Sequence, residues 1–334
     1  MAVLYLVEQG ASLHKDSDVL SVTKDSTVLQ RIPAAKVEQV VIFGNINITT
    51  PVIHYLLEQG IDCVFCSSTG RYHGRLLSTE SKYGLLRQSQ LKATQNTAMR
   101  TTIARLIVKG KLANQRTMLM RYAREEPSAP LDGPIEAIHK SMENAEKAPD
   151  IGSLLGIEGY AGNVYYGALK LVIKQDLGFQ CRVRRPPRDP VNSLLSFGYT
   201  LLTYAAQAAV RVVGLDPFIG FLHSTEYSKP SLALDIMEEF RPLIVDSVVL
   251  RVLNNNILTA ASFEPSTERS GMVKLRPEAV KTFLHHYEER IQTSIQHPLT
   301  GEQVDYRRCL ELQARQLARI ITGQQSVYQP FITR

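Results

Sequence analysis

The spacing of apolar residues changes once along this chain of 334 residues, close to residue 85. Before that point, short β-branched segments between turn residues predict strands at 3–7, 19–23, 27–31, 37–43, 61–66 and 72–77. One helix interrupts them, with Thr50 as its cap, Pro51 in its first turn and Gly60 at its end. Beyond residue 85, apolar residues recur at helical spacing.

The helical pattern extends over most of the remaining chain. It predicts helices at 85–122, 151–174, 191–213, 231–240, 277–292 and 306–322. Residues 125–150 contain four prolines and predict a mobile connection around a short helix. We therefore expect an α+β protein with a small N-terminal β-rich domain (residues 1–84) and a larger all-α C-terminal domain (residues 85–334) that carries the functional site.

Composition narrows the class of protein. Hydrophobic residues make up 44% and charged residues 21%, which excludes wholesale disorder. The chain lacks an apolar run of the ~20 residues that a membrane helix needs, and its start lacks the basic residues of a signal peptide. Four cysteines are too few for a disulfide framework and indicate a cytoplasmic protein. The net charge of +6 is compatible with a polyanionic partner.

Two of the cysteines, Cys63 and Cys66, form a CxxC motif. A structural zinc site would need a second such pair, which the sequence lacks. The alternation of residues around the motif favours a buried strand over a redox or metal site.

Three places in the helical part carry polar groups in apolar surroundings, where a charge is costly unless it is paired or bound to a metal. Glu158 lies among small residues, and His223 closes an apolar run. Asp235 and Glu238 share one face of a helix, and Glu239 is geometrically as good a partner for Asp235. Each of these residues alone also fits an ordinary structural role.

Taken together, the three places are more specific. A Glu, a His and a further Glu or Asp form a mixed nitrogen and oxygen donor set with coordination positions left open. Such a set suits Mn²⁺ or Mg²⁺ better than a closed zinc site.

Basic residues near these places suggest a nucleic-acid partner. Nine Lys or Arg and no Asp or Glu occur between Arg87 and Arg124. A stretch of one sign favours phosphate contact over a solvated helix face. The candidate DNA-binding residues are Arg105, Lys109 and Arg116 on one helix face, Arg182, Arg184 and Arg185 (with Arg188) in a Pro-rich loop, and Lys229 and Arg241 beside the acidic helix.

Three sequence blocks resemble one known family. They are Gly-Ile-Glu-Gly from Gly156, the block Asp-Pro-Val-Asn-Ser-Leu-Leu-Ser-Phe-Gly-Tyr from Asp189, and Gly-Phe-Leu-His from Gly220 followed by Ser-Leu-Ala-Leu-Asp-Ile-Met-Glu-Glu-Phe-Arg-Pro. Their order and spacing resemble the CRISPR-associated spacer-acquisition integrases and endonucleases of the Cas1 family, over essentially the whole chain.

The resemblance implies a site, partners and a reaction. It places the family's metal ligands on Glu158, His223 and Glu238, selecting Glu238 over Glu239, and a supporting acid on Asp235. It implies a homodimer formed through the N-terminal domain, and the small Cas2 protein as a partner that bridges two such dimers on a short DNA duplex. The reaction it implies is phosphodiester transesterification, in which a 3′-hydroxyl of the spacer duplex attacks the CRISPR repeat. Asp235 would orient His223, hold a metal-bound water or assist proton transfer.

Two other classes of protein fit the same residues. One is a non-catalytic DNA-binding scaffold whose acidic cluster holds a structural ion. The other is a metal-dependent phosphohydrolase that acts on a small substrate, with the basic segments incidental. A Ser-His-Asp hydrolase is more distant, since the surroundings of His223 lack the glycine pattern of a nucleophile elbow.

Overall fold

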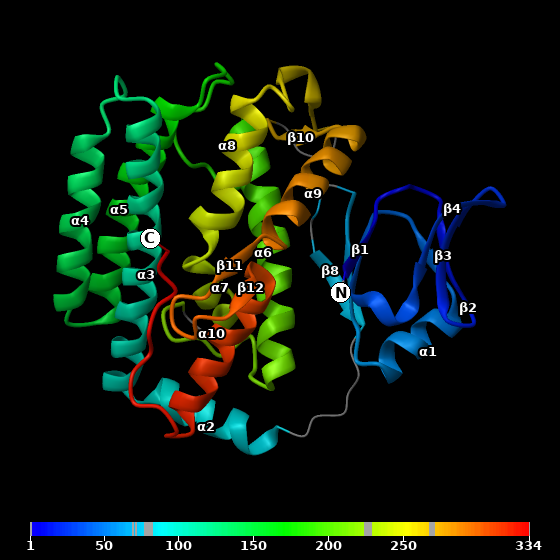
Figure 1. Cartoon of the computed structure of the whole chain (residues 1–334), viewed down its shortest axis with the longest axis horizontal. Coiled ribbons are helices and arrows are strands. Elements are labelled where there is room, and N and C mark those ends of the chain that lie inside the picture. Colours follow the sequence, from blue (N-terminus) through cyan, green and yellow to red (C-terminus); the bar gives the residue numbers. More distant parts are fainter. Residues whose placement is uncertain are drawn as a thin grey trace. The chain divides into compact units, whose positions relative to one another are not determined.

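The computed structural model describes residues 2–68, 70, 72–76, 83–223, 229–266 and 271–333. The chain divides into two compact units, Met1–Ser81 and Lys82–Arg334 (Figure 1). The first unit is rich in strands and the second is predominantly helical, which confirms the predicted α+β fold class. The role of the first unit in dimerisation stays a prediction.

Two four-stranded sheets build the first unit. In the first sheet three parallel strands are followed by an antiparallel edge strand, in the spatial order β1 (Ala2–Leu6), β5 (Val37–Phe43), β7 (Asp62–Cys66) and β8 (Tyr72–Leu76). The second sheet is an antiparallel meander with a short parallel strand at one edge, in the order β4 (Thr27–Pro33), β3 (Val19–Lys24), β2 (Ser12–Asp16) and β6 (Asn47–Ile48).

Both turns of the meander contain Asp and Ser residues. Ser17, between β2 and β3, has φ 49°, and Asp25 and Ser26, between β3 and β4, have φ 47° and 64°. Asp and Ser are among the residues that form such tight turns most readily. Strand β2 was not predicted, because Leu13 is its one fully buried residue and one apolar residue gives no alternation.

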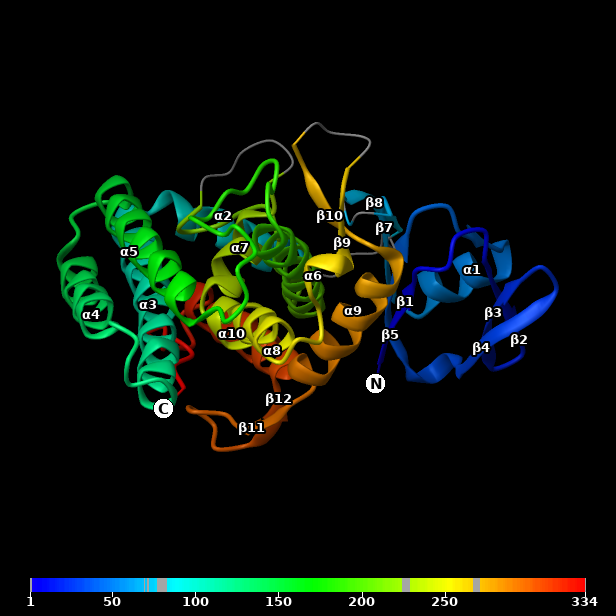
Figure 2. The ribbon, with the colours of Figure 1, turned by 90° about the horizontal axis from the view of Figure 1, so that it is seen from above.

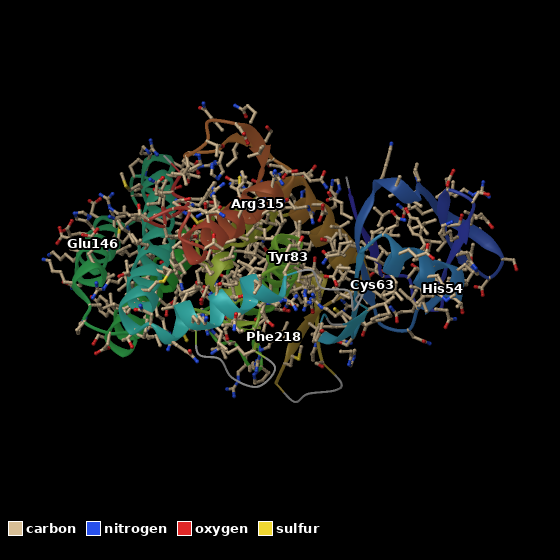
Figure 3. The ribbon with its side chains drawn as sticks, turned by 90° about the horizontal axis from the view of Figure 1, so that it is seen from below. His54, Cys63, Tyr83, Glu146, Phe218 and Arg315 are labelled. Atoms are coloured by element: carbon tan, nitrogen blue, oxygen red, sulfur yellow. The ribbon has the colours of Figure 1, made fainter. Side chains whose placement is uncertain are left out.

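The core of this unit lies between the sheets and α1 (Thr50–Glu58), which begins after Thr49 rather than after the predicted cap Thr50. Val52 and Leu56 of α1 are fully buried in a cluster that includes Cys63 of β7. Both cysteines of the CxxC motif are buried free thiols, as the strand interpretation predicted (Figure 3 labels Cys63).

The second unit is built from helices, of which α3, α4 and α5 run side by side (Figures 1 and 2). The helices are α2 (Gly84–Gln95), α3 (Thr97–Glu125), α4 (Asp132–Lys147), α5 (Ile151–Val172), α6 (Pro190–Val213), α7 (Ser231–Glu238), α8 (Ser247–Asn254), α9 (Pro277–Ile291) and α10 (Tyr306–Ile321). Two short hairpins add to the predicted all-α architecture, β9 (Phe263–Pro265) with β10 (Val273–Leu275) and β11 (Ser294–Gln296) with β12 (Gln303–Asp305). Within the described ranges, every helix is too short or too polar to cross a bilayer.

One local prediction was only partly right. The proline-rich segment 125–150 does hold a helix, as predicted, but α4 is 16 residues long, because Pro134 falls in its first turn, where a missing N–H costs nothing. A residue directly before a proline usually avoids helical geometry, but Arg241, which precedes Pro242, is helical, with φ −53° and ψ −52°. The chain continues from it into a π-helical segment, Pro242–Asp246, whose wider turn accommodates the proline ring, and then into α8.

The C-terminal segment, for which the sequence predicted no role, packs onto this unit. Phe331 is fully buried, and its ring stacks on Phe240 with centroids 4.7 Å apart. The amide of Asn114 on α3 donates to the carbonyl of Phe331 at 2.7 Å and accepts from the N–H of Thr333 at 3.0 Å. Gly110 permits this approach, since a Cβ there would lie 2.8 Å from Pro330.

The burial of the cysteines predicts their reactivity. Burial raises the pKa of Cys63 and of Cys309 to about 12, and thiolates are the reactive form. The native protein at pH 8 should therefore react quickly with a thiol reagent at the exposed Cys181 alone, and at all four cysteines after unfolding in urea. Cys181→Ser is the matched control and should abolish the fast phase. Fast native labelling of Cys63 or Cys66, located by mass spectrometry, would contradict the buried strand.

Candidate active site

Two carboxylates from separate helices meet at one lysine. Lys111 of α3 places its ammonium against Glu158 Oε1 of α5, and 2.6 Å from Glu238 Oε2 at the end of α7. The side chains of Lys111 and Glu238 are 5% and 4% exposed, whereas that of Glu158 is 19% exposed. Helix α3 therefore supplies a cation at the point where two acidic groups, 80 residues apart in sequence, converge.

His223 joins this group through its second nitrogen. Its Nδ1 lies 2.7 Å from Asp235 Oδ1, and its Nε2 lies 3.9 Å from Glu238 Oε1. An ionised carboxylate cannot donate, so Nδ1 carries the proton of this hydrogen bond, and Nε2 is the ring nitrogen nearer to Glu238. Burial disfavours the charged imidazole, but the hydrogen bond and negative charge of Asp235 outweigh it and raise the pKa of His223 above its ordinary value.

Asp235 also holds the backbone that carries His223. Its Oδ2 accepts from the N–H groups of Phe221 at 2.5 Å and Leu222 at 3.0 Å, and its Oδ1 accepts from the N–H of His223 at 2.9 Å. Gly220 allows the loop to come this close, because a Cβ there would lie 2.9 Å from Asp235 Oδ2. Of the three roles considered for Asp235, this geometry favours the orientation of His223.

Glu238 and Glu239 face opposite ways. Glu238 points to the site, while the carboxylate of Glu239 accepts hydrogen bonds from Tyr328 and Phe331 of the C-terminal segment, at 2.9 and 2.8 Å, and from Gln313 at 2.9 Å. Burial raises the pKa of Glu239 to about 8. Residue spacing could not decide which of the two faces the site. In the structure Glu238 lies in the site, and Glu239 binds the C-terminal segment.

A second cation neighbours Glu238 on the side away from Lys111. Arg241 donates to Glu238 Oε1 at 2.7 Å, and its guanidinium lies 4.0 Å from the ring centroid of Tyr199. Burial opposes the ionisation of Glu238, but the charges of Arg241 and Lys111 hold the pKa of this carboxyl below its usual range. Glu238 is thus a buried anion stabilised by two cations.

The predicted phosphate-binding face of α3 is largely engaged within the protein. Arg105 donates to the carbonyl of Ala148 at 2.8 Å, and Lys109 forms an ion pair with Glu146 of α4 at 2.5 Å (Figure 3 labels Glu146). Arg116 is half-buried. The stretch itself contains no acidic residues, and the partners of Arg105 and Lys109 come from the end of α4 and the residue that follows it.

The remaining basic candidates differ in exposure. Arg182 is half-buried and donates to Asn192 at 2.8 Å and to Ser196 at 3.0 Å, whereas Arg184 and Arg185 are exposed. Lys229 is half-buried, and the polar loop before it, residues 224–228, lies outside the described residues. Their contact with DNA stays a prediction.

Lys111 was missed because it was counted among the nine basic residues. It lies four residues after Ile107 and eight after Ile103, on the apolar stripe of α3. A lysine at a core-facing position was the sequence signal that could have found it.

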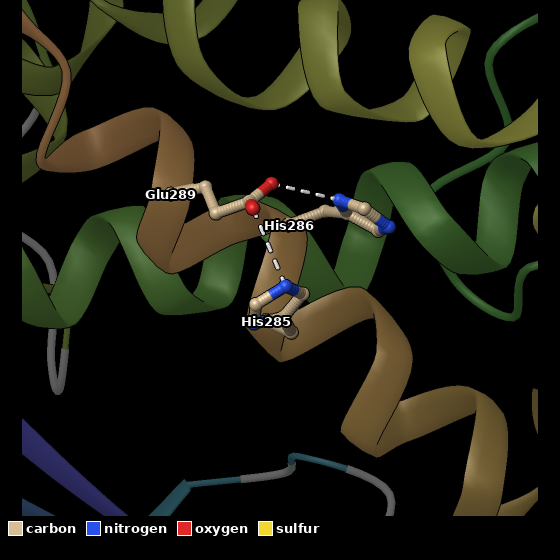
Figure 4. Close-up of side chains that lie close together, drawn as sticks. All are labelled: His285, His286 and Glu289. Atoms are coloured by element: carbon tan, nitrogen blue, oxygen red, sulfur yellow. Dashed lines mark hydrogen bonds and ion pairs between the residues drawn. The ribbon is translucent and has the colours of Figure 1, made fainter.

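Another cluster also has ligand chemistry. Among the residues that the structure describes, one group of His, Cys, Asp and Glu side chains has all its ligand atoms within 4.8 Å of one another, namely His285, His286 and Glu289 on α9 (Figure 4). His285 is 69% exposed, and Glu289 also pairs with Arg251 at 3.4 Å. Ion pairs of this kind are common on helix surfaces, and we assign the cluster no function.

The Glu158, His223 and Glu238 group has the chemistry of a divalent-cation site. It offers two carboxylates and one imidazole nitrogen, which ligates in its unprotonated form and is oriented by a carboxylate behind the ring. An ammonium already lies between two of the three side chains, so this pocket accommodates a positive charge. The donor set suits Mn²⁺ or Mg²⁺ and contains no thiolate.

Comparison with known proteins gives the family. A family model described as CRISPR associated protein Cas1 matches residues 4–289. The chain belongs to the Cas1 family. The CRISPR-associated endonuclease Cas1 3 of Thermus thermophilus is 38% identical over 336 residues, which cover 100% of this chain and 98% of that relative.

Solved Cas1 structures have the same fold as this family member. A CAS1 protein from Thermotoga maritima aligns with a TM-score of 0.83 and 25% identity, covering 100% of both chains. A chain of a Cas6-RT-Cas1–Cas2 complex aligns with a TM-score of 0.83 and 27% identity, covering 99% of this chain and 36% of that one.

The contacts of Asp235 predict its effect on stability. Asp235→Asn replaces one acceptor oxygen by a donor that faces backbone N–H groups, so we expect a loss of about 3 kcal/mol in the free energy of unfolding. Urea denaturation followed by circular dichroism measures this loss. His223→Ala is the control, because it leaves the three backbone donors bound to Asp235 and should cost less than half as much. Equal losses in the two variants would contradict the role of Asp235 in holding the loop.

Proposed function

We propose that this protein is a divalent-metal-dependent DNA endonuclease and integrase that inserts short duplexes into a CRISPR array by phosphodiester transesterification. The observation that carries the proposal is the convergence of Glu158 and Glu238 on Lys111, with His223 Nε2 3.9 Å from Glu238 and Asp235 behind His223. Membership of the Cas1 family supports the same reaction class.

Each side chain then has a defined task. Glu158, His223 and Glu238 would hold Mn²⁺ or Mg²⁺, which when bound supplies a Lewis acid for the scissile phosphate. Asp235 would keep the proton on Nδ1 of His223, so that the unprotonated Nε2 could act as the metal ligand. Arg241 stays beside Glu238 and balances its charge, which keeps this carboxylate ionised and able to ligate.

Transesterification needs little free energy from outside, because one phosphodiester replaces another. The protein's main contribution is then to position the attacking 3′-hydroxyl and the repeat strand. We infer that the exposed Arg184 and Arg185 contact phosphates of the prespacer duplex or the CRISPR repeat, since each is a fully charged donor of bidentate bonds.

The proposed assembly is a homodimer that binds DNA together with Cas2. Support for Cas2 comes from the related chain, which was solved in a Cas6-RT-Cas1–Cas2 complex. The N-terminal unit would form the dimer, and the protein would act in the cytoplasm, where the CRISPR array lies.

One experiment tests the reaction. Purified protein is incubated with a supercoiled repeat-bearing plasmid and a short duplex, with Mn²⁺ or with a chelator, with and without Cas2. Strand transfer that requires the metal is the expected result. DNA binding without metal-dependent chemistry would favour a scaffold with a structural ion. Hydrolysis of small phosphate esters with weak, salt-insensitive DNA binding would favour a phosphohydrolase.

Substitution at the centre should separate chemistry from binding. We expect Glu158→Gln and His223→Ala to lower strand transfer at least about 100-fold, because each removes a ligand, while duplex DNA affinity largely persists. His285→Ala/His286→Ala removes the surface cluster of α9 and should leave the rate unchanged. Full activity in either site variant, measured on plasmid, would refute the metal-site assignment.

The exposed arginines should act on binding instead. Arg184→Ala/Arg185→Ala should weaken duplex binding and reduce the slope of log K against log salt by about 2, one per lost phosphate contact. Fluorescence anisotropy over a salt series measures both quantities. Arg121→Ala is the control, since Arg121 is exposed but paired with Glu125 on its own helix at 2.8 Å. A slope unchanged from the wild type would remove Arg184 and Arg185 from the DNA surface.

A further inference from the structure

Lys111 occupies the position where the two acidic ligands of the proposed site come closest. Its ammonium contacts Glu158 and lies 2.6 Å from Glu238 Oε2, and its side chain is 5% exposed. A bound Mg²⁺ or Mn²⁺ lies about 2.0–2.2 Å from carboxylate oxygens, so an ion shared by both carboxylates would need the volume that the ammonium now fills. One ammonium and one divalent ion cannot both lie between these two oxygens.

The charges explain why a cation is needed there at all. Glu158 and Glu238 are brought together by the packing of α5 and α7 on α3, and Glu238 is almost completely buried. Two carboxylates this close repel each other unless a positive charge separates them. Arg241 binds Oε1 of Glu238 on one side, and Lys111 supplies the charge that both carboxylates share.

We propose that Lys111 is a built-in counter-ion that holds the metal-free site together and is displaced from at least one carboxylate when the divalent cation binds. This inference rests on the proposed function, because it assumes that Glu158 and Glu238 are metal ligands. Lysine suits the task, since its compact ammonium sits on a flexible four-carbon stem that can swing while α3 stays in place.

The exchange has a consequence for ion selection. A monovalent ion such as Na⁺ or K⁺ brings no more charge than the ammonium that it would replace, and it lacks the tether. A divalent ion brings twice that charge at a shorter distance to oxygen. Lys111 would thus lower the affinity of the site for every cation, and only divalent ions would still displace its ammonium.

Metal affinity is the first test. In Lys111→Met the stem keeps its length and the charge is lost, so we expect the dissociation constant for Mn²⁺, measured by calorimetry without DNA, to fall about tenfold or more. Lys109→Met is the matched control on the same helix, because Lys109 pairs with Glu146 outside the site. It should change the Mn²⁺ affinity by less than about twofold.

Stability without metal is the second test and needs neither DNA nor activity. In EDTA, the melting temperature of Lys111→Met should fall by about 5 °C or more, because the buried carboxylate of Glu238 loses one of its two cations. Lys111→Met/Glu158→Gln removes one of the two repelling charges and should recover at least about half of that loss. Saturating Mn²⁺ should stabilise Lys111→Met by more degrees than it stabilises the wild type.

The outcomes separate the two levels of the proposal. Equal Mn²⁺ affinity in the wild type and Lys111→Met, or weaker binding in the variant, would refute displacement and leave the metal site standing. Absence of Mn²⁺ binding in both proteins would overturn the metal site and the inference together. If Lys111→Met does not fold in EDTA, Lys111→Gln, which retains a hydrogen-bond donor, should show the same direction of change in affinity.

Discussion

The buried charge of Glu238 sets the arrangement of the helical unit. A carboxylate that is 4% exposed needs cations within contact distance, and those come from two different segments, α3 through Lys111 and the turn after α7 through Arg241. Because Lys111 also binds Glu158, the same requirement draws α5 to α3. The ion pairs that join α3 to α5 and α7 are therefore the same ones that form the candidate site.

Further buried polar groups around Arg241 are also paired. Asp246, in the π-helical segment, accepts from Tyr165 at 2.8 Å and from Tyr199, and the ring of Tyr199 lies against the guanidinium of Arg241. Burial raises the pKa of Asp246 above its ordinary value, and the two tyrosine hydroxyls compensate in part. Arg241 is thus fixed on one side by a carboxylate and on the other by an aromatic face, which makes it a rigid neighbour for Glu238.

Much of this protein could be predicted from local patterns, and the failures have physical reasons. The periodicity of apolar residues predicted most helices and strands, because an element that is buried on one face repeats its apolar residues at a fixed spacing. The length of helix α4 was hidden by prolines, of which Pro134 lies at a position that tolerates it. The packing of α4 on α3 could not be predicted either, so Glu146 was not recognised as the partner of Lys109.

The candidate site, too, could be predicted only in part. His223, Asp235 and Glu238 were found as polar groups in apolar surroundings, and the structure brings them together. The role of Glu239 could not be predicted, because two of its donors, Tyr328 and Phe331, lie 89 and 92 residues away in a segment without periodicity. Lys111 escaped for a related reason, since a lysine reveals nothing of the carboxylates that will face it after folding.

The docking of the C-terminal segment has a consequence for what supports the site. Tyr328 and Phe331 provide hydrogen bonds to Glu239, the residue next to Glu238, from 89 and 92 residues away in the sequence. A chain cut before Tyr328 would leave the buried carboxylate of Glu239 without those two donors. Such a chain would keep Glu158, His223 and Glu238 and lose packing directly behind Glu238, so the geometry of the candidate site depends on a segment outside it.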